Sequence, residues 1–323
     1  MSPATPRSAE GPRPRVGVSA CLLGERVRYD GGHKRDSFVA DTLSRFVTFV
    51  PVCPELELGL GTPREPIRLE RRPGGLRLLG VRSGTDHTEA MEGYAAGRLD
   101  ALAREDLAGY VLKKDSPSCG MERVKVIGRG GVPSRDGRGA FAARLLERFP
   151  LLPVEEEGRL NDPVLRRSFV VRLYAGQRLK GLFGRRWGRG EAVDFHAREK
   201  LLLMAHEPEA YRELGRLVAR IKDLPRAEFA ARYSARFMAG LSKGATRGRH
   251  ANVLQHVAGY FKAAPEEDRA EIAEAIEEYR RGVAPLEAPL TLLRHHVRRS
   301  NEAWLRAQTY FDPCPRELLA ENP

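Results

Sequence analysis

The sequence predicts an α/β domain built on a largely parallel sheet, followed by an all-α domain. Short apolar segments rich in β-branched or aromatic residues, bounded by turn residues, predict buried strands at 16–20, 46–52 and 109–112. Amphipathic segments at 36–46 and 86–104 alternate with them and predict helices. Because strands alternating with helices form parallel sheets covered on both faces, the N-terminal domain is expected to be Rossmann-like.

The remaining elements of this first domain follow from the same patterns. In segment 86–104, Asp86 is the expected N-cap, with Glu89 three residues later and an apolar face that begins at Met91. A helix at 141–149 and a strand at 151–154 complete the domain.

Strand patterns nearly vanish after residue 190. The region 191–308 is rich in Ala, Leu, Glu and Arg at helical spacing, and its Pro and Gly breaks predict five or six helices in an all-α domain. The expected organisation is a disordered leader at 1–14, the α/β domain at 15–155, a basic linker at 156–190 and the all-α domain at 191–323.

The compartment follows from what the chain lacks. Segment 1–14 is rich in Pro, Ser and Arg without the apolar core of a secretion signal, and no apolar run has the length of a membrane span. We therefore expect a cytoplasmic protein without a membrane partner. In the reducing cytosol, its four cysteines are more often metal ligands, nucleophiles or core residues than disulfides.

The net charge of +12 is unevenly placed. Residues 191–323 carry 21 Lys/Arg against 20 Asp/Glu, so nearly all of the surplus precedes them. Two stretches, 164–190 and 230–265, contain basic residues and no acidic ones. Such blocks are typical of proteins that bind polyanions, and equally of Arg-rich surfaces in thermostable or GC-rich proteomes.

Three cysteines, Cys21, Cys53 and Cys119, each closely follow a predicted strand. Because the carboxyl ends of parallel strands share one edge, the three thiols are expected to meet there. A cubane 4Fe-4S cluster usually has four cysteine ligands, so three would leave one iron free to bind a soft substrate sulfur. Spacing alone also permits buried or unrelated cysteines. Cys314 is not needed for such a site.

Longer motifs surround these cysteines. They are Ser-Ala-Cys-Leu-Leu-Gly at 19–24 with Val-Arg-Tyr-Asp-Gly-Gly-His-Lys at 27–34, Val-Cys-Pro-Glu at 52–55 with Gly-Leu-Gly-Thr-Pro-Arg-Glu-Pro at 59–66, and Leu-Lys-Lys-Asp-Ser-Pro-Ser-Cys-Gly at 112–120. Together they resemble the TudS thiouracil desulfidase family. The resemblance implies a 4Fe-4S cluster on Cys21, Cys53 and Cys119, with Glu55 and a serine as catalytic residues. The serine is Ser116 or Ser118, of which Ser116 is favoured.

The helical part resembles the YbgA-type domain. The matching stretches lie at 195–200 with 204–206, at 250–256 with 259–262, and at 308–311. Cys314, between Pro313 and Pro315, departs from the aromatic residue expected there. A chain that joins the two domains is similar to the RudS family of tRNA 4-thiouridine desulfidases, which implies tRNA as the substrate.

The resemblance implies a non-redox cleavage of a carbon–sulfur bond in which oxygen replaces sulfur. The open iron would bind the sulfur of 4-thiouridine, Glu55 would act as base on water or as acid on the ring nitrogen, and Ser116 would orient that water or donate to the developing anion. Glu55 could instead be only a stabilising charge at a helix N-terminus. Two other functions remain open: a free thiouracil desulfidase, and a non-catalytic RNA-binding or cluster-binding sensor.

Further residues are candidates for binding. The expected substrate contacts are Arg28, Lys34, Arg64 and Ser118. The turn at 31–34 either contacts a phosphate or is a plain turn. Trp187 either stacks on a base or packs at the domain junction, and His250 and His256 are expected to pack or to face RNA. The expected RNA contacts are Arg185, Arg186, Arg189, Lys243, Arg247 and Arg249.

Overall fold

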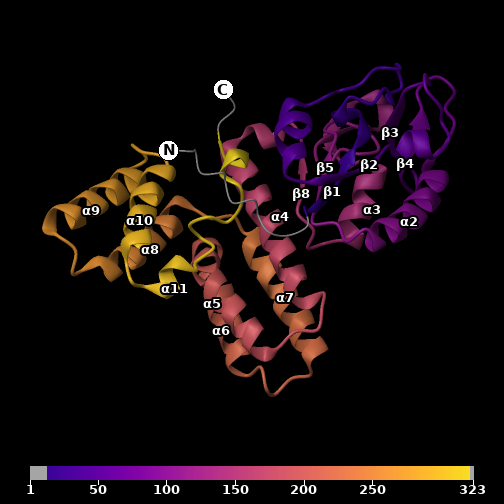
Figure 1. Ribbon diagram of the computed structural model, residues 1–323. Coiled ribbons are helices and arrows are strands. Elements are labelled where there is room, and N and C mark those ends of the chain that lie inside the picture. The colour runs from indigo at the N-terminus through magenta and orange to yellow at the C-terminus, as the bar shows by residue number, and fades with distance from the viewer. Residues whose placement is uncertain (1–12, 321–323) are drawn as a thin grey trace. The chain divides into compact units, whose positions relative to one another are not determined.

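The computed structural model describes residues 13–320, which divide into two compact units (Figure 1). Unit 1 extends to Phe169 and includes the chain again from Glu317, and unit 2 spans Val170–Arg316. Twelve of the fourteen residues predicted as a leader lie outside the described residues. Among the described residues, no helix combines the length and apolar character that crossing a bilayer requires.

Unit 1 contains the predicted parallel sheet. Its strands β1 (Arg15–Ser19), β2 (Thr48–Val52), β5 (Gly109–Leu112) and β8 (Val154–Glu156) are all parallel, in the order β2-β1-β5-β8. The sequence therefore predicted the fold class correctly: an α/β domain with a parallel sheet precedes a helical region. The order also places β1 between β2 and β5, so that the segments following these three strands emerge at one edge.

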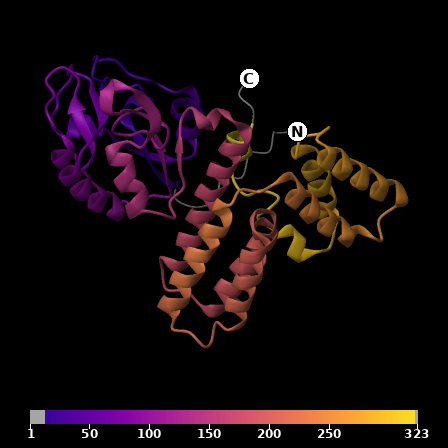
Figure 2. The ribbon, with the colours of Figure 1, turned by 180° about the vertical axis from the view of Figure 1, so that it is seen from behind.

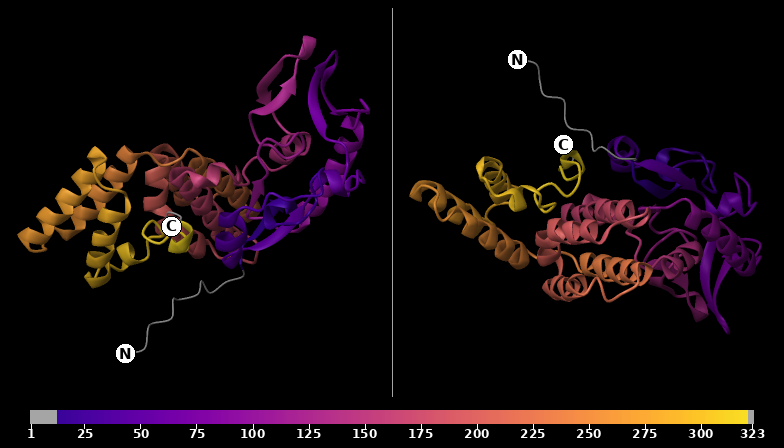
Figure 3. Two further views of the ribbon diagram at one scale, coloured as in Figure 1. Left: turned by 90° about the horizontal axis from the view of Figure 1, so that it is seen from above. Right: turned by 60° about the horizontal axis from the view of Figure 1, so that its bottom comes forward.

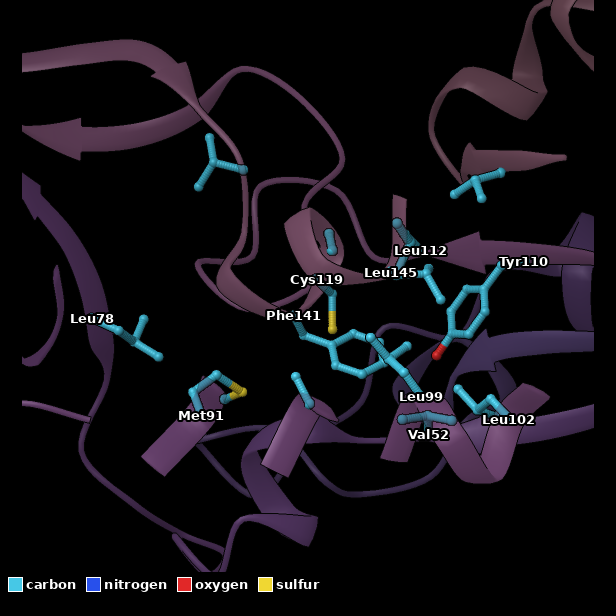
Figure 4. Close-up of a cluster of buried hydrophobic side chains, with 14 of the residues drawn as sticks. Val52, Leu78, Met91, Leu99, Leu102, Tyr110, Leu112, Cys119, Phe141 and Leu145 are labelled. Carbon is cyan, nitrogen blue, oxygen red and sulfur yellow. The ribbon is translucent and has the colours of Figure 1, made fainter. Parts of the chain in front are cut away.

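Helices α2 (Thr88–Arg104) and α3 (Ala140–Arg148) bury their apolar faces against this sheet. Leu99 and Leu102 of α2 and Phe141 of α3 form one hydrophobic core with Tyr110 of β5, and Cys119 belongs to the same core (Figure 4). This packing fixes the residues that follow β5, because Cys119 is held among side chains from both helices.

Two helix predictions need correction. The segment 36–46 forms a π-helical turn (Phe38–Thr42) and a 3-10 turn (Leu43–Arg45) instead of one regular helix. The N-cap of α2 is His87, not Asp86. Asp86 forms a β-bridge with Leu79, so its backbone is extended, while its carboxylate accepts a hydrogen bond from the Thr88 amide at 2.9 Å.

A second sheet in unit 1 was not predicted. Its strands are β3 (Ile67–Arg72), β4 (Gly75–Gly80), β6 (Val124–Ile127) and β7 (Pro133–Gly137), in the order β4-β3-β6-β7. The β3–β4 and β6–β7 pairs are antiparallel, and β3 and β6 pair in parallel (Figure 3, left). One face is apolar and buried, through Leu69, Leu78, Val124 and Val126.

Most of the segment predicted as a basic linker, 156–190, is helical. Helix α4 (Pro163–Phe183) runs for 21 residues from unit 1 into unit 2. Its basic residues alternate with apolar ones, and Phe169, Val170 and Leu173 are buried. Burial of these apolar residues stabilises a helix in a segment whose basic composition alone suggested a linker.

Unit 2 is all-helical, as expected (Figure 2). Its described residues include six helices of twelve or more residues and a short α11 (Ala303–Arg306). The six are α5 (Arg189–His206), α6 (Pro208–Ala219), α7 (Arg226–Ser242), α8 (Arg247–Ala258), α9 (Glu266–Arg281) and α10 (Glu287–Arg299). An aromatic cluster of Phe183, Trp187, Phe229 and Tyr233 lies within this unit.

Candidate functional site

The three predicted cysteines line one cleft of about 580 Å³ in unit 1. Cys21 lies in the 3-10 turn (Ala20–Leu23) that follows β1, and Cys53 precedes the short helix α1 (Pro54–Glu57) that follows β2. Cys119 lies in the turn that follows β5. The structure thus brings together three thiols that are far apart in sequence, at the shared carboxyl edge of neighbouring parallel strands.

Burial raises the pKa of all three thiols. The pKa of Cys21 rises to about 11, that of Cys53 is raised, and that of Cys119 rises well above its usual value. The negative charges of Cys21 and Cys53 also disfavour ionisation of Cys119, whereas the Lys113 ammonium opposes the shift at Cys21. The three groups therefore ionise reluctantly on their own, and a cationic metal centre would favour their thiolate forms.

The donor set fits an iron–sulfur cluster better than a single ion. Among the described residues, no three His, Cys, Asp or Glu side chains are arranged to hold one metal ion. Thiolates on a multi-iron cluster bind different irons and so lie farther apart than the ligands of a single ion. The described residues that line the cleft include three soft thiols and no histidine, which favours iron–sulfur chemistry.

Glu55 lies in the first turn of α1 and lines the same cleft. Its Oε1 accepts a hydrogen bond from the Ser118 hydroxyl at 2.9 Å. Its Oε2 accepts two hydrogen bonds from the Arg64 guanidinium, from Nη2 at 2.6 Å and from Nε at 3.1 Å. Both carboxylate oxygens are thus held by donors, which fixes the orientation of Glu55 beside the cysteines.

The two candidate serines have different contacts. Ser116 lines the cleft, and its Oγ accepts hydrogen bonds from the backbone amides of Ser118 at 3.2 Å and Cys119 at 3.1 Å. Ser118 is fully buried and contacts Glu55 directly. Ser116 therefore shapes the turn that carries Cys119. Ser118 holds the Glu55 carboxylate and does not line the cleft, which differs from its predicted role as a substrate contact.

Arg64, a predicted substrate contact, lines the cleft, but its guanidinium is bound within the protein. Its guanidinium donates to Glu55, to the Gly61 carbonyl at 2.8 Å and to the Val27 carbonyl at 3.1 Å, and its side chain is only 5% exposed. Because these donors are already used within the protein, the role that the contacts of Arg64 indicate is to hold Glu55 in position.

Arg28 and Lys34 both line the cleft, as candidate substrate contacts should. The buried Nε of Arg28 has no hydrogen-bond acceptor within the described structure and lies 3.6 Å from Asp30. The neighbouring turn is a plain one. The Gly31 amide donates to the Arg28 carbonyl at 3.0 Å, and the Gly32 amide donates to the Asp30 side chain at 3.0 Å, so neither is available to a phosphate.

Six charged residues of the cleft were missed in the sequence: Arg35, Asp36, Lys113, Lys114, Asp115 and Glu157. Lys113 at the end of β5 pairs with Glu157, which follows β8 and also accepts a hydrogen bond from the Lys114 amide at 2.8 Å. Asp36 lines the cleft as well, and burial raises its pKa. Strand ends would have pointed to Lys113 and Glu157, because each follows a parallel strand as the cysteines do.

In unit 2, four of the six predicted RNA contacts are bonded within the protein. Arg185 pairs with Glu191, and Arg189 donates to the Ile221 carbonyl at 3.2 Å. Arg247 donates to the Tyr279 carbonyl at 3.1 Å, and Arg249 donates to the His206 carbonyl. Arg186 and Lys243 are exposed.

Two aromatic predictions are resolved in favour of packing. Trp187 is 7% exposed, with its ring 5.0 Å from that of Phe183, so it does not present a free face to a base. His250 is buried, and its Nδ1 lies 2.8 Å from the Tyr310 hydroxyl. His256 is exposed and packs edge-on against Tyr260. Cys314 is buried in unit 2 and does not line the cleft.

Comparison with known proteins divides the chain in the same way. The profile of the 2-thiouracil desulfurase family matches residues 16–157, and that of DUF1722, a family of unknown function, matches residues 200–315. The uncharacterised protein YbgA of Escherichia coli K12 is 37% identical over 153 residues, which cover 47% of this chain and 90% of YbgA.

Two further relatives match the chain. The uncharacterised protein YbbK of Bacillus subtilis 168 is 37% identical over 110 residues, which cover 32% of this chain and 71% of YbbK. The solved structure of TudS, a [4Fe-4S]-dependent thiouracil desulfidase, is 35% identical and has a TM-score of 0.39. That match covers 46% of this chain and 93% of the solved one.

Proposed function

This chain belongs to the 2-thiouracil desulfurase family through its N-terminal part and to the YbgA family through its C-terminal part, and we therefore propose that it removes sulfur from 4-thiouridine in tRNA. The proposed product is uridine, and the proposed cofactor is a 4Fe-4S cluster held by Cys21, Cys53 and Cys119. The proposed site of action is the cytoplasm.

One observation carries the chemical part of this proposal. Three buried thiols and a carboxylate with both oxygens held by donors line the same cleft. A sensor needs the thiols alone, whereas a desulfidase also needs a group that handles the protons of water. The Glu55 arrangement therefore favours an enzyme over a cluster-binding sensor.

The overall reaction exchanges the sulfur of a thiocarbonyl for the oxygen of water and releases hydrogen sulfide, so electrons balance without an oxidant or reductant. When bound, the cluster supplies an iron with an exchangeable position, which acts as a Lewis acid toward the substrate sulfur. Glu55 accepts a proton from the attacking water at its carboxylate, while Arg64 and Ser118 keep that carboxylate in place. Arg28 and Lys34 contact the polar groups of the nucleotide.

Charge supports a nucleic acid as the carrier of the thiolated base. Residues 170–316, which form unit 2, contain 27 Lys/Arg and 18 Asp/Glu, a surplus of nine positive charges. Recognition of a free base requires no surplus of positive charge, whereas a positively charged surface attracts the phosphates of a nucleic acid.

The experiment that tests this proposal compares substrates. We would reconstitute the full chain with iron and sulfide without oxygen and measure kcat/KM for thiolated tRNA, 4-thiouridine and 4-thiouracil. A much higher value for tRNA, falling steeply with salt, supports the proposal. Equal or higher values for 4-thiouracil would instead make the protein a free thiouracil desulfidase, and a stable cluster without turnover on any substrate would make it a sensor.

A further inference from the structure

We propose that the second sheet of unit 1 binds the phosphate backbone of the RNA substrate next to the cleft. This proposal rests on the proposed function, and it places an RNA contact outside the helical unit.

The sheet is strongly basic. The two segments that contain it, 66–87 and 123–138, hold ten Lys/Arg and three Asp/Glu, a surplus of seven positive charges. The described helices α2 and α3 of the same unit carry no such surplus, because 88–104 and 140–148 together hold four Arg and four Asp/Glu.

The strand register gathers these charges on one face. Side chains alternate along a strand, and the apolar face carries Leu69, Leu78 and Val126. The pairings Glu70 with Arg77 and Glu70 with Ile127 show which residues share the opposite face. That outer face carries Arg68, Glu70, Arg72, Arg77, Lys125 and Ile127, together with the buried Leu79, which pairs with Arg68.

Internal ion pairs neutralise only part of this charge. Glu70 accepts hydrogen bonds from both Arg68 and Arg72, which leaves one of these two charges unbalanced. Arg82, Arg123 and Lys125 are exposed. The Glu65 carboxylate accepts a hydrogen bond from the Arg82 amide at 2.9 Å and offsets part of the Arg82 charge, whereas no ion pair among the described residues involves the side chains of Arg123 or Lys125. Exposed pairs are weak in any case, so the surface keeps a positive potential that phosphates can exploit.

The basic sheet is continuous with the cleft. A second hollow of about 550 Å³ shares Arg64 and Ile67 with the cysteine cleft. Its other walls include Glu65 and, from the segment between β4 and α2, Arg82 and His87. A nucleotide whose base enters the cysteine cleft would therefore place its neighbours along this hollow, toward the basic strands.

The chemistry of the outer face favours RNA over an acidic protein as its partner. A protein interface has an apolar core surrounded by a polar rim, whereas this face carries two apolar side chains, Leu79 and Ile127, of which Leu79 is buried. Spaced Arg and Lys side chains suit a row of phosphates. The surface therefore fits the sugar–phosphate backbone that continues from the thiolated nucleotide.

The test neutralises one residue of the hollow and one of the outer face. In the reconstituted holoenzyme, Arg82→Gln with Lys125→Gln should raise KM for thiolated tRNA by about tenfold at physiological salt and lower the log–log salt slope by about 2. Both kcat and kcat/KM for 4-thiouracil should stay unchanged, because neither residue touches the cysteine cleft. The charge-conserving variant Arg82→Lys with Lys125→Arg should retain the tRNA KM.

The matched control, Arg45→Gln with Arg104→Gln, removes the same charge from exposed positions of the same unit. Arg45 lies in the 3-10 turn before β2, and Arg104 lies at the C-terminal end of α2. It should leave the tRNA KM near the wild-type value. Wild-type turnover of tRNA with an unchanged KM in the Arg82/Lys125 variant would overturn this inference and leave the proposed function standing. Wild-type turnover of 4-thiouracil alone would overturn the proposed function and, with it, this inference.

Discussion

The Arg64 guanidinium holds the Glu55 carboxylate, with Nη2 lying 2.6 Å from Oε2, and the two side chains are 5% and 14% exposed. The same nitrogen donates to the Val27 carbonyl, which also accepts the Cys53 thiol at a sulfur–oxygen distance of 3.7 Å. Arg64 therefore links the orientation of the proposed base to the loop beside one proposed cluster ligand. Such a fixed fork is a property that lysine does not reproduce.

Replacing Arg64 by lysine should lower kcat without loss of the cluster. The variant keeps the charge but loses the two donors that orient Oε2, and a small misplacement of a catalytic group costs about 100-fold in rate. We expect kcat on 4-thiouracil to fall toward that extent, with KM and iron content near wild type. Arg144→Lys, at an exposed ion pair with Glu92, is the control and should behave as wild type. An unchanged kcat in the Arg64 variant would show that Glu55 needs no such support.

The two serines can be separated by comparing their alanine variants. Ser118→Ala removes the donor to Oε1 of Glu55 and should lower kcat by about tenfold with iron content unchanged. Ser116→Ala removes the acceptor that holds the amides of Ser118 and Cys119, so it should lower cluster retention as well as activity. Iron analysis alongside kinetics distinguishes them. Full iron content in Ser116→Ala with no turnover would instead make Ser116 the catalytic serine.

Each of the three cleft cysteines should be required for the cluster. Serine at Cys21, Cys53 or Cys119 replaces a soft thiolate by a poor iron ligand, so iron content and visible absorbance after reconstitution should fall severalfold. Cys314→Ser is the matched control, because Cys314 is also buried but lies in unit 2. Loss of iron in the Cys314 variant would indicate a four-cysteine cluster without an exchangeable iron.

His196 should make unit 2 less stable at acidic pH. Burial, and next the Lys200 charge, lower its pKa from 6.5 to about 4. The unfolded chain therefore binds the proton first, so stability is full above pH 6.5 and falls as the pH drops from 6.5 to 4. By pH 5 the loss amounts to about 2 kcal/mol.

His196→Gln, which can keep a hydrogen bond to Tyr233, should remove that part of the pH dependence. Both tryptophans, Trp187 and Trp304, lie in unit 2, so their fluorescence during urea unfolding at pH 7 and pH 5 reports on this unit. His256→Gln, at an exposed position, should change nothing. Equal pH dependence in the wild type and the His196 variant would contradict this assignment.

Sequence patterns sufficed for β1, β2 and β5 because these strands contain short apolar segments such as Gly109–Leu112, which the structure reproduces with the same bounds. The fourth strand was predicted at 151–154 but spans Val154–Glu156, where two buried glutamates interrupt the apolar pattern. The meeting of Cys21, Cys53 and Cys119 followed from their shared position after those strands. The second sheet was missed because its strands mix charged and apolar residues: Leu69 lies between Arg68 and Glu70, and its burial depends on pairing with Leu78.

The parts of the site that escaped prediction depend on side-chain partners. Nothing in the local sequence of Arg64 distinguishes a guanidinium bound to Glu55 from one that faces a substrate, because the two residues lie nine positions apart on a turn and a helix. Ser118 is likewise separated from Glu55 by 63 positions. Long-range side-chain pairing of this kind appears only once the strands are placed.

The most direct test of the account is turnover of thiolated tRNA in water enriched in ¹⁸O, with the full chain reconstituted with iron and sulfide without oxygen. Mass spectrometry of the nucleosides, together with a sulfide assay, follows both products. The account predicts that 4-thiouridine becomes uridine with one ¹⁸O per converted base and one released sulfide, and that Glu55→Gln abolishes conversion while the cluster absorbance remains. Cluster-independent conversion, or full activity of the Glu55 variant, would contradict it.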